Sequence, residues 1–331
     1  MLNPDLKLNQ KVFNDDVEQI PIRKGFGEGL SQAGETNKSI VALSADLTES
    51  TQMLSFKEKF PERFIEIGVA EQNLATVASG MAAMGKYPFF SSYAMFSPGR
   101  NWEQIRTTLA YNDRTAVIVG SHAGISVGPD GGTHQAIEDI ALMRVMPRMT
   151  VISPCDSIQA KQATLALSQN PTLAYLRLAR EKTPVITTPE TPFELGKGQI
   201  FYRPDGLAQV AIIATGSLVS HALRAARDLE KKGIRVIVVN IHTIKPLDTE
   251  LVIALAKETK AIVTVEEHQI AGGLGGAVAE VLAQHAPTPM VFIGVHDEFG
   301  QSGSPAQLIE HYHMGRDGIT KAVLEVLEKK G

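Results

Sequence analysis

The chain has a single cysteine, Cys155, among its 331 residues. One thiol cannot form an internal disulfide, which excludes a disulfide-stapled secreted scaffold and fits a reducing compartment. No uncharged apolar run approaches the roughly 18 residues that a membrane-spanning helix needs. The opening residues, through Asn14, Asp15 and Asp16, carry acids and have no long apolar stretch. We therefore expect no signal peptide and a cytoplasmic location.

An excess of positive charge is also missing. Lys and Arg number 32 against 36 Asp and Glu, which gives a formal net charge of -4. Because the two signs are interspersed and form no basic stripe, nucleic acid and membranes are not expected as partners. Hydrophobic residues make up 44% of the chain, and its length is sufficient for two domains, each with its own core.

Short apolar runs alternate with helical patterns, which predicts parallel α/β layers. Strands are expected at 40–44, 64–67, 88–91, 115–120, 150–153 and 173–178, with helices at 22–33, 70–84, 101–111, 135–144 and 157–167. A second unit is expected to have strands at 210–214, 236–240, 261–265 and 290–293, with helices after Ser217, Leu247, Gly275 and Ser304.

Prolines and threonines between residues 182 and 198 predict a linker that separates the two units. The predicted fold class is α/β with two domains, each a mostly parallel sheet flanked by helices. The predicted boundaries are an N-terminal extension at 1–20, a first domain at 21–182, a linker at 183–198 and a second domain at 199–331.

The segment Gly-Val-Ala-Glu-Gln-Asn at 68–73 places Glu71 in the first turn of an amphipathic helix. Ala75, Ala78 and Ala82 follow on the same stripe, where small side chains let a backbone or a flat ligand approach closely. A desolvated carboxylate tends to hold its proton or to share it with a ring nitrogen. The alternative is that Glu71 only favours the positive end of the helix dipole.

Five stretches, in order along the chain, resemble the transketolase family in its pyrimidine-binding and C-terminal domains. They are Ser-Ala-Asp-Leu at 44–47, Gly-Val-Ala-Glu-Gln-Asn at 68–73, Pro-Phe-Phe-Ser-Ser-Tyr-Ala-Met-Phe at 88–96, Gly-Pro-Asp-Gly-Gly-Thr-His-Gln at 128–135 and Glu-Glu-His-Gln-Ile-Ala-Gly-Gly-Leu-Gly-Gly-Ala at 266–277. The resemblance implies thiamine diphosphate-dependent transfer of a two-carbon ketol unit from a ketose phosphate to an aldose phosphate. A 1-deoxyxylulose-5-phosphate synthase, a 2-oxoacid dehydrogenase β subunit and a non-catalytic module of the same fold remain as alternatives.

Members of this family hold the diphosphate of the cofactor and its divalent metal with a Gly-Asp-Gly segment and a later Asn. No Gly-Asp-Gly occurs in this chain. A diphosphate needs a metal ion and backbone donors at a helix N-terminus. The resemblance therefore implies an N-terminal transketolase subunit that holds the diphosphate and Mg²⁺ or another divalent metal. We expect no metal site in this chain and a heterotetramer with two copies of each chain.

The same resemblance assigns cofactor-binding residues besides Glu71. Phe96 would stack on the aminopyrimidine and Tyr93 would lie close to it, while Asp46 and Leu47 would line the cofactor pocket. The alternatives are that both aromatics belong to the core and that Asp46 is only a turn or cap residue.

Polar residues in the glycine-rich stretch 120–135 are the candidates for sugar recognition. By resemblance, His122 and His134 contact the sugar and Asp130 reads a substrate hydroxyl. Histidine can also move protons near neutral pH, so His122 and His134 are catalytic candidates together with Glu71. The alternative is that the three side chains bind a metal, although their spacing fits no standard closed site.

Phosphate recognition is assigned to Arg23, Ser50 and one arginine of Leu-Arg-Leu-Ala-Arg at 176–180. The planar fork of arginine matches a phosphate oxyanion. Arg180 aligns best with the family's phosphate residue, and Arg177 could exchange roles with it. Solvated side chains are the alternative for each arginine.

Overall fold

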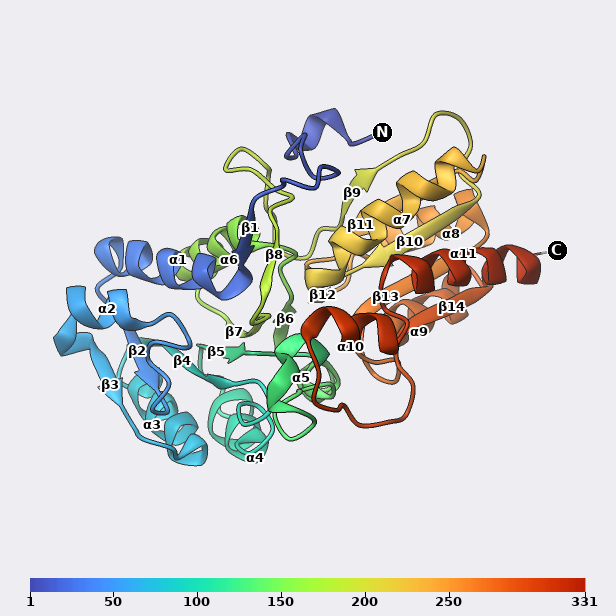
Figure 1. Cartoon of the computed structure of the whole chain (residues 1–331). Helices are drawn as coiled ribbons and strands as arrows, with labels where there is room; N and C mark the ends of the chain where they lie inside the picture. Colours follow the sequence, from blue (N-terminus) through green and yellow to red (C-terminus); the bar gives the residue numbers. More distant parts are fainter. Residues whose placement is uncertain (331) are drawn as a thin grey trace.

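The computed structural model describes residues 1–330, in which two large sheets lie next to each other (Figure 1). The seven-stranded sheet has the order β12-β6-β7-β5-β4-β2-β3, and all its neighbours are parallel except β12 with β6. Its strands are β2 (Ile40–Ser44), β3 (Phe64–Glu66), β4 (Tyr87–Tyr93), β5 (Ala116–Ser121), β6 (Thr150–Ile152), β7 (Leu173–Arg177) and β12 (Thr243–Lys245).

Helices cover both faces of this sheet, because its strands carry apolar side chains on both faces. Successive side chains of a strand point to opposite faces, so strands that are covered on both sides are apolar throughout. In β2, Ile40 and Ala42 pack into the apolar cluster of α1 and α6, whereas Val41 and Leu43 pack into that of α3. The helices are α1 (Ile22–Thr36), α2 (Leu54–Lys59), α3 (Glu71–Ala83), α4 (Trp102–Gln104), π-helix η3 (Ile105–Ala110), α5 (Asp139–Arg144) and α6 (Ser157–Gln169).

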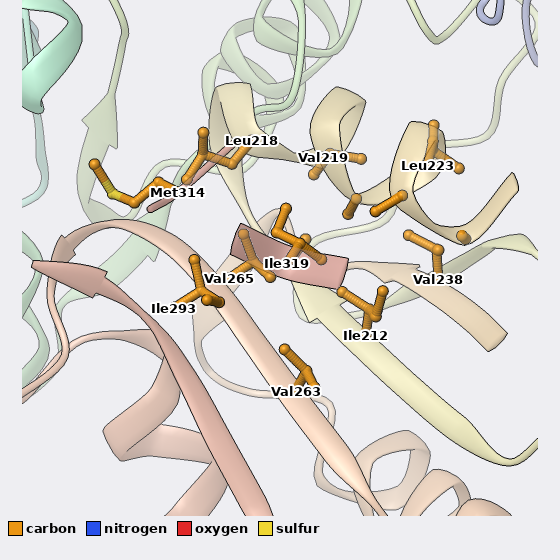
Figure 2. Close-up of a cluster of buried hydrophobic side chains, with 14 of the residues drawn as sticks. Ile212, Leu218, Val219, Leu223, Val238, Val263, Val265, Ile293, Met314 and Ile319 are labelled. Atoms are coloured by element: carbon orange, nitrogen blue, oxygen red, sulfur yellow. The ribbon is translucent and has the colours of Figure 1, made fainter. Parts of the chain in front are cut away.

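The five-stranded sheet has the order β14-β13-β10-β11-β9, with β9 antiparallel to β11 and the other neighbours parallel. Its elements are β9 (Gln199–Tyr202), β10 (Val210–Ala214), α7 (Val219–Lys231), β11 (Val236–Asn240), α8 (Thr249–Thr259), β13 (Ile262–Gln269), α9 (Leu274–His285), β14 (Met290–Val295), α10 (Pro305–His311) and α11 (Arg316–Lys330). Figure 2 shows one of its faces, where Ile212 and Val263 meet Leu223 of α7 and Ile319 of α11.

The predicted fold class is confirmed, and the bounds predicted for β2, β10 and β11 coincide with those observed. The segment predicted as a linker begins with strand β8 (Lys182–Pro184), which pairs antiparallel with β1 (Gln19–Pro21). Two expected helices were wrong in extent. The single helix expected at 101–111 is a short α-helix followed by η3, and the helix expected at 135–144 begins only at Asp139.

Further elements were not predicted at all: α2, β9, β12, α11 and the 3₁₀ segments η1 (Pro4–Leu6), η2 (Pro61–Arg63), η4 (Ile125–Asp130) and η5 (Gly216–Leu218). Strand β12 is the most informative of these, because it follows β11 in the chain yet pairs with β6 of the other sheet. Within residues 1–330, no helix is both long enough and apolar enough to cross a membrane.

Candidate active site

The predicted site residues follow the carboxyl ends of neighbouring strands in the seven-stranded sheet. Asp46 follows β2, Tyr93 ends β4, His122 follows β5 and Arg180 follows β7. The carboxyl ends of parallel strands meet at one edge of a sheet, where open α/β sheets bind their ligands. Glu71 reaches the same edge from the first turn of α3, after the loop that follows β3.

Glu71 is buried, with 1% of its surface exposed. Its Oε1 accepts a hydrogen bond from Ser92 Oγ at 3.1 Å, and its Oε2 accepts one from Arg100 Nη1 at 2.6 Å. Asn101 Nδ2 donates to the Glu71 backbone carbonyl at 3.0 Å. The carboxylate is therefore fixed in direction and paired with a cation, so a role limited to the helix dipole leaves most of its contacts unexplained.

Sequence reasoning did not single out Ser92, Arg100 or Asn101. The sequence spacing could have indicated Arg100, because it follows Phe96 by four residues, the spacing of one helical turn. The Arg100 backbone N–H donates to the Phe96 carbonyl at 2.9 Å, which is the bond of one helical turn. Side chains four apart on such a turn share a face.

Aromatic and imidazole rings cluster beside this carboxylate. Tyr93 stacks on His122 with ring centroids 3.9 Å apart, and Phe96 meets the His134 ring edge-on at 5.4 Å. The Arg100 guanidinium lies over the Phe96 ring, 4.9 Å from its centroid. The structure thus brings the predicted cofactor aromatics and the predicted sugar-binding histidines together.

His122 is nearly inaccessible, and its Nδ1 lies 2.8 Å from Ser121 Oγ. Burial, reinforced by the positive charges of Arg23 and Arg180, lowers the pKa of His122 to about 3. At neutral pH the ring is therefore uncharged and has one nitrogen that donates and one that accepts. Such a ring can bind both hydroxyl and carbonyl oxygens.

Arg23 and Arg180 converge at the same edge. Arg23 Nη1 donates to the Ser50 carbonyl at 2.6 Å, and Arg180 Nη1 donates to the Val127 carbonyl at 2.6 Å. The Asp130 carboxylate lies 3.9 Å from Arg180 Nη1. Burial, together with the charge of Arg180, lowers the pKa of Arg23. The arrangement presents two guanidinium groups of like charge next to each other.

Arg177 lies in different surroundings from Arg180. Its Nε donates to Asp139 Oδ2 at 2.7 Å, and its Nη2 donates to the Glu267 carbonyl at 2.8 Å. Both side chains of this ion pair are almost completely buried. The structure therefore separates two arginines that the sequence left interchangeable, and only Arg180 lies beside Arg23.

Asp46 and Leu47 form a tight turn at the rim of the site. Asp46 has a left-handed backbone (φ 59°), and its backbone N–H donates to Glu66 Oε1 at 2.7 Å. The Leu47 backbone N–H donates to Ser44 Oγ at 3.1 Å. These contacts show the turn role that was the alternative for Asp46, while its exposed carboxylate leaves a role at the rim open. Within the described chain, no group of three or more His, Cys, Asp or Glu side chains could hold a metal ion.

Two family profiles match the sequence, one for each sheet. The transketolase pyrimidine binding domain matches residues 18–185, and the transketolase C-terminal domain matches residues 204–319. The chain belongs to the transketolase family. The five stretches recognised in the sequence fall within these two matches, the first four in the pyrimidine binding domain and the fifth in the C-terminal domain.

Relatives of this transketolase-family chain include single subunits of similar length. A putative transketolase C-terminal section of Methanocaldococcus jannaschii is 43% identical over 93% of this chain and 97% of its own. A 6-deoxy-6-sulfo-D-fructose transketolase subunit of Clostridium sp. (strain MSTE9) is 38% identical over 96% of this chain and 98% of its own. The structure of a split gene transketolase, an inactive β4 tetramer, superposes with a TM-score of 0.87 at 41% identity and covers 94% of this chain and all of its own.

Proposed function

We propose that the chain is the C-terminal subunit of a thiamine diphosphate-dependent transketolase. The subunit would transfer a two-carbon ketol unit from a ketose phosphate to an aldose phosphate, and only together with an N-terminal subunit. The observation that carries this proposal is the buried Glu71 carboxylate, which lies at the same sheet edge as the aromatic and imidazole cluster and the Arg23–Arg180 pair.

The residues fit the aminopyrimidine end of the cofactor. A buried carboxylate can face a ring nitrogen, and Phe96 offers an aromatic surface for stacking, with Tyr93 close by. Glu71 would hold or share a proton at the pyrimidine N1′, and Asp46 and Leu47 would lie at the rim. Thiamine diphosphate, when bound, supplies the carbon that carries the two-carbon unit and the electron sink for the transfer.

Sugar recognition would fall to the residues around this site. Neutral His122, together with His134 and Asp130, would bind hydroxyl and carbonyl oxygens of the sugar. Arg23 and Arg180, with Ser50, would bind its terminal phosphate. One relative is named for a sugar sulfonate, 6-deoxy-6-sulfo-D-fructose, and another for a sugar phosphate, apulose 4-phosphate. A guanidinium pair is suited to the terminal anion of either class.

The partner would supply what this chain lacks. No Gly-Asp-Gly segment is present, so the diphosphate and Mg²⁺ or another divalent metal would be held by the N-terminal subunit. The split gene relative that forms a β4 tetramer is described as inactive, which supports a requirement for the other chain. We propose a heterotetramer of two plus two subunits that acts in the cytoplasm, in the pentose phosphate pathway. The phosphate-binding arginines favour sugar phosphates over a lipoyl substrate.

Reconstitution tests this proposal. The chain would be mixed with the N-terminal transketolase subunit of its native host, thiamine diphosphate and Mg²⁺, and ketol transfer between sugar phosphates would be measured. Activity is expected only in the mixture, with each subunit alone as the control. Ketol transfer by this chain alone, or a stable complex that binds the cofactor but transfers nothing between ketose and aldose phosphates, would contradict the proposal.

A further inference from the structure

The Arg100 side chain contacts both surfaces that would receive the aminopyrimidine. Its Nη1 donates to Glu71 Oε2 at 2.6 Å, and its guanidinium lies 4.9 Å from the centroid of the Phe96 ring. About half of the Arg100 side chain is exposed, at 48%, whereas Glu71 is buried. A flat cation thus bridges the carboxylate and the aromatic ring from the solvent side.

The local chain delivers Arg100 to this position. One helical turn connects it to Phe96, because the Arg100 N–H donates to the Phe96 carbonyl. The next residue, Asn101, is fully buried and donates both to the Glu71 carbonyl at 3.0 Å and to Ser97 Oγ at 3.1 Å. The backbone of this segment is therefore clamped to the start of α3, while the guanidinium itself stays at the surface.

We propose that Arg100 controls the access of the aminopyrimidine ring to Glu71 and Phe96, a role that rests on the function proposed above. A guanidinium stacks on an aromatic face and donates to a carboxylate. An aminopyrimidine that stacks on the same face and donates from N1′ to the same carboxylate makes the same two contacts. The two groups compete, so binding of the ring requires Arg100 to leave.

Arg100 is free to leave at low cost. Among residues 1–330, Glu71 is the only hydrogen-bond acceptor of its side chain. The half-exposed guanidinium can exchange this bond for bonds to water, which leaves the buried carboxylate available to the ring. Glu71 keeps its bond from Ser92 throughout, so the carboxylate stays oriented during the exchange. Arg100 therefore acts as a competitor of the ring for Glu71, and it is not needed to orient the carboxylate.

Equilibrium dialysis of thiamine diphosphate against the complex with the N-terminal subunit tests this role. With Mg²⁺ saturating, the Arg100→Ala and Arg100→Gln variants are expected to lower the Kd at least fivefold, because the competitor is gone. Arg100→Lys keeps a charge but loses the flat fork, so its Kd is expected to lie between those of Arg100→Ala and wild type. Arg203→Ala is the matched control: Arg203 pairs with Glu258 at the same 2.6 Å and is 46% exposed, but it directly follows β9 of the five-stranded sheet.

Magnesium pyrophosphate separates competition for the ring from a general effect on the complex. It lacks the aminopyrimidine, so its Kd is expected to be the same in wild type and in all four variants. A thiamine diphosphate Kd that stays unchanged or rises in both Arg100→Ala and Arg100→Gln would overturn the proposal for Arg100 and leave the proposed function intact. A wild-type complex that binds no thiamine diphosphate would overturn both, and the melting temperature of each variant shows whether it is folded.

Discussion

Arg23 donates its Nε–H to the backbone carbonyl of Arg180 across 3.3 Å. This contact joins the beginning of α1 to the loop after β7, two segments that lie far apart in the sequence. It holds two guanidinium cations side by side, and their like charges repel each other until an anion binds between them. The neighbouring carboxylates of Asp130 and Glu181 lie 3.9 and 3.7 Å from Arg180 nitrogens, so they relieve the repulsion only in part. Under the proposed function, this pair would receive the terminal anion of the sugar substrate.

Replacing Arg180 with alanine is expected to raise the KM for a ketose phosphate roughly 10- to 100-fold. The reason is the loss of a charge-assisted hydrogen bond to phosphate, which contributes about 1.5–3 kcal/mol. Steady-state kinetics of the two-subunit enzyme measure this change. The kcat/KM for a substrate without a phosphate should stay near that of wild type.

Two further variants sharpen the experiment on Arg180. Arg180→Lys keeps the charge and loses the fork, so an intermediate KM is expected. Lys182→Ala removes an exposed positive charge two residues away and should leave the KM unchanged. Equal losses for phosphorylated and unphosphorylated substrates would show that Arg180 supports the loop rather than the phosphate.

Arg177→Met is expected to act on stability instead of on recognition. Removing one partner of a buried ion pair leaves Asp139 as an uncompensated charge, which costs about 3–5 kcal/mol. Urea unfolding of the isolated chain measures this loss. Adding Asp139→Asn to Arg177→Met should recover part of the stability, because it removes the buried charge that has lost its partner. A folded Arg177→Met variant whose only defect is a raised KM for sugar phosphates would contradict the prediction.

The sequence predicted those elements whose evidence is local. Strands β2, β10 and β11 are continuous apolar runs bounded by polar or turn residues, and their bounds were found correctly. Strand β12 has three residues and no such run, and it joins the seven-stranded sheet because Thr243 pairs with Ile152 of β6. A pairing between residues so far apart leaves no local pattern.

The site shows the same division between local and tertiary information. Motifs indicated Glu71, the aromatic residues and the histidines, because the types and spacing of these residues carry the signal. The sequence alone could not separate the roles of Arg177 and Arg180. Arg177 ends strand β7 and turns inward to Asp139, whereas Arg180 follows the strand. The contact of Arg100 with Glu71 likewise depends on how the chain after β4 packs on α3.

Glu71→Gln is expected to lower kcat by about 10²- to 10⁴-fold, the usual contribution of a group that transfers a proton. Glutamine has nearly the same shape and can still accept the Ser92 hydrogen bond, so the fold should be retained. Rapid-mixing or steady-state assays of ketol transfer measure the loss, with circular dichroism as the check on folding. Glu103→Gln changes an exposed acid on α4 and serves as the control. Full activity of Glu71→Gln would eliminate Glu71 as the group at N1′.

The lowered pKa of His122 predicts how the stability of the fold changes with pH. Burial and the nearby positive charges lower its pKa to about 3, against roughly 6.5 in an unfolded chain. Between these two values the unfolded chain binds a proton that the folded chain does not. The stability contributed by His122 is therefore greatest above pH 6.5, and it falls by up to about 1.4 kcal/mol for each pH unit below that value. The loss continues until the pH reaches the pKa of the folded protein.

His122→Asn isolates this contribution. His122 has a left-handed backbone (φ 58°), which asparagine tolerates better than most residues. His221, His242 and His268 also have pKa values lowered to about 4 by burial, but they are present in both proteins, so their effects cancel in the comparison. Between pH 7.5 and 5.5, urea unfolding should show wild type losing about 1.4 kcal/mol more than His122→Asn. Equal losses would mean that His122 takes up its proton at the ordinary pH, and a neutral imidazole could no longer be assigned to sugar binding.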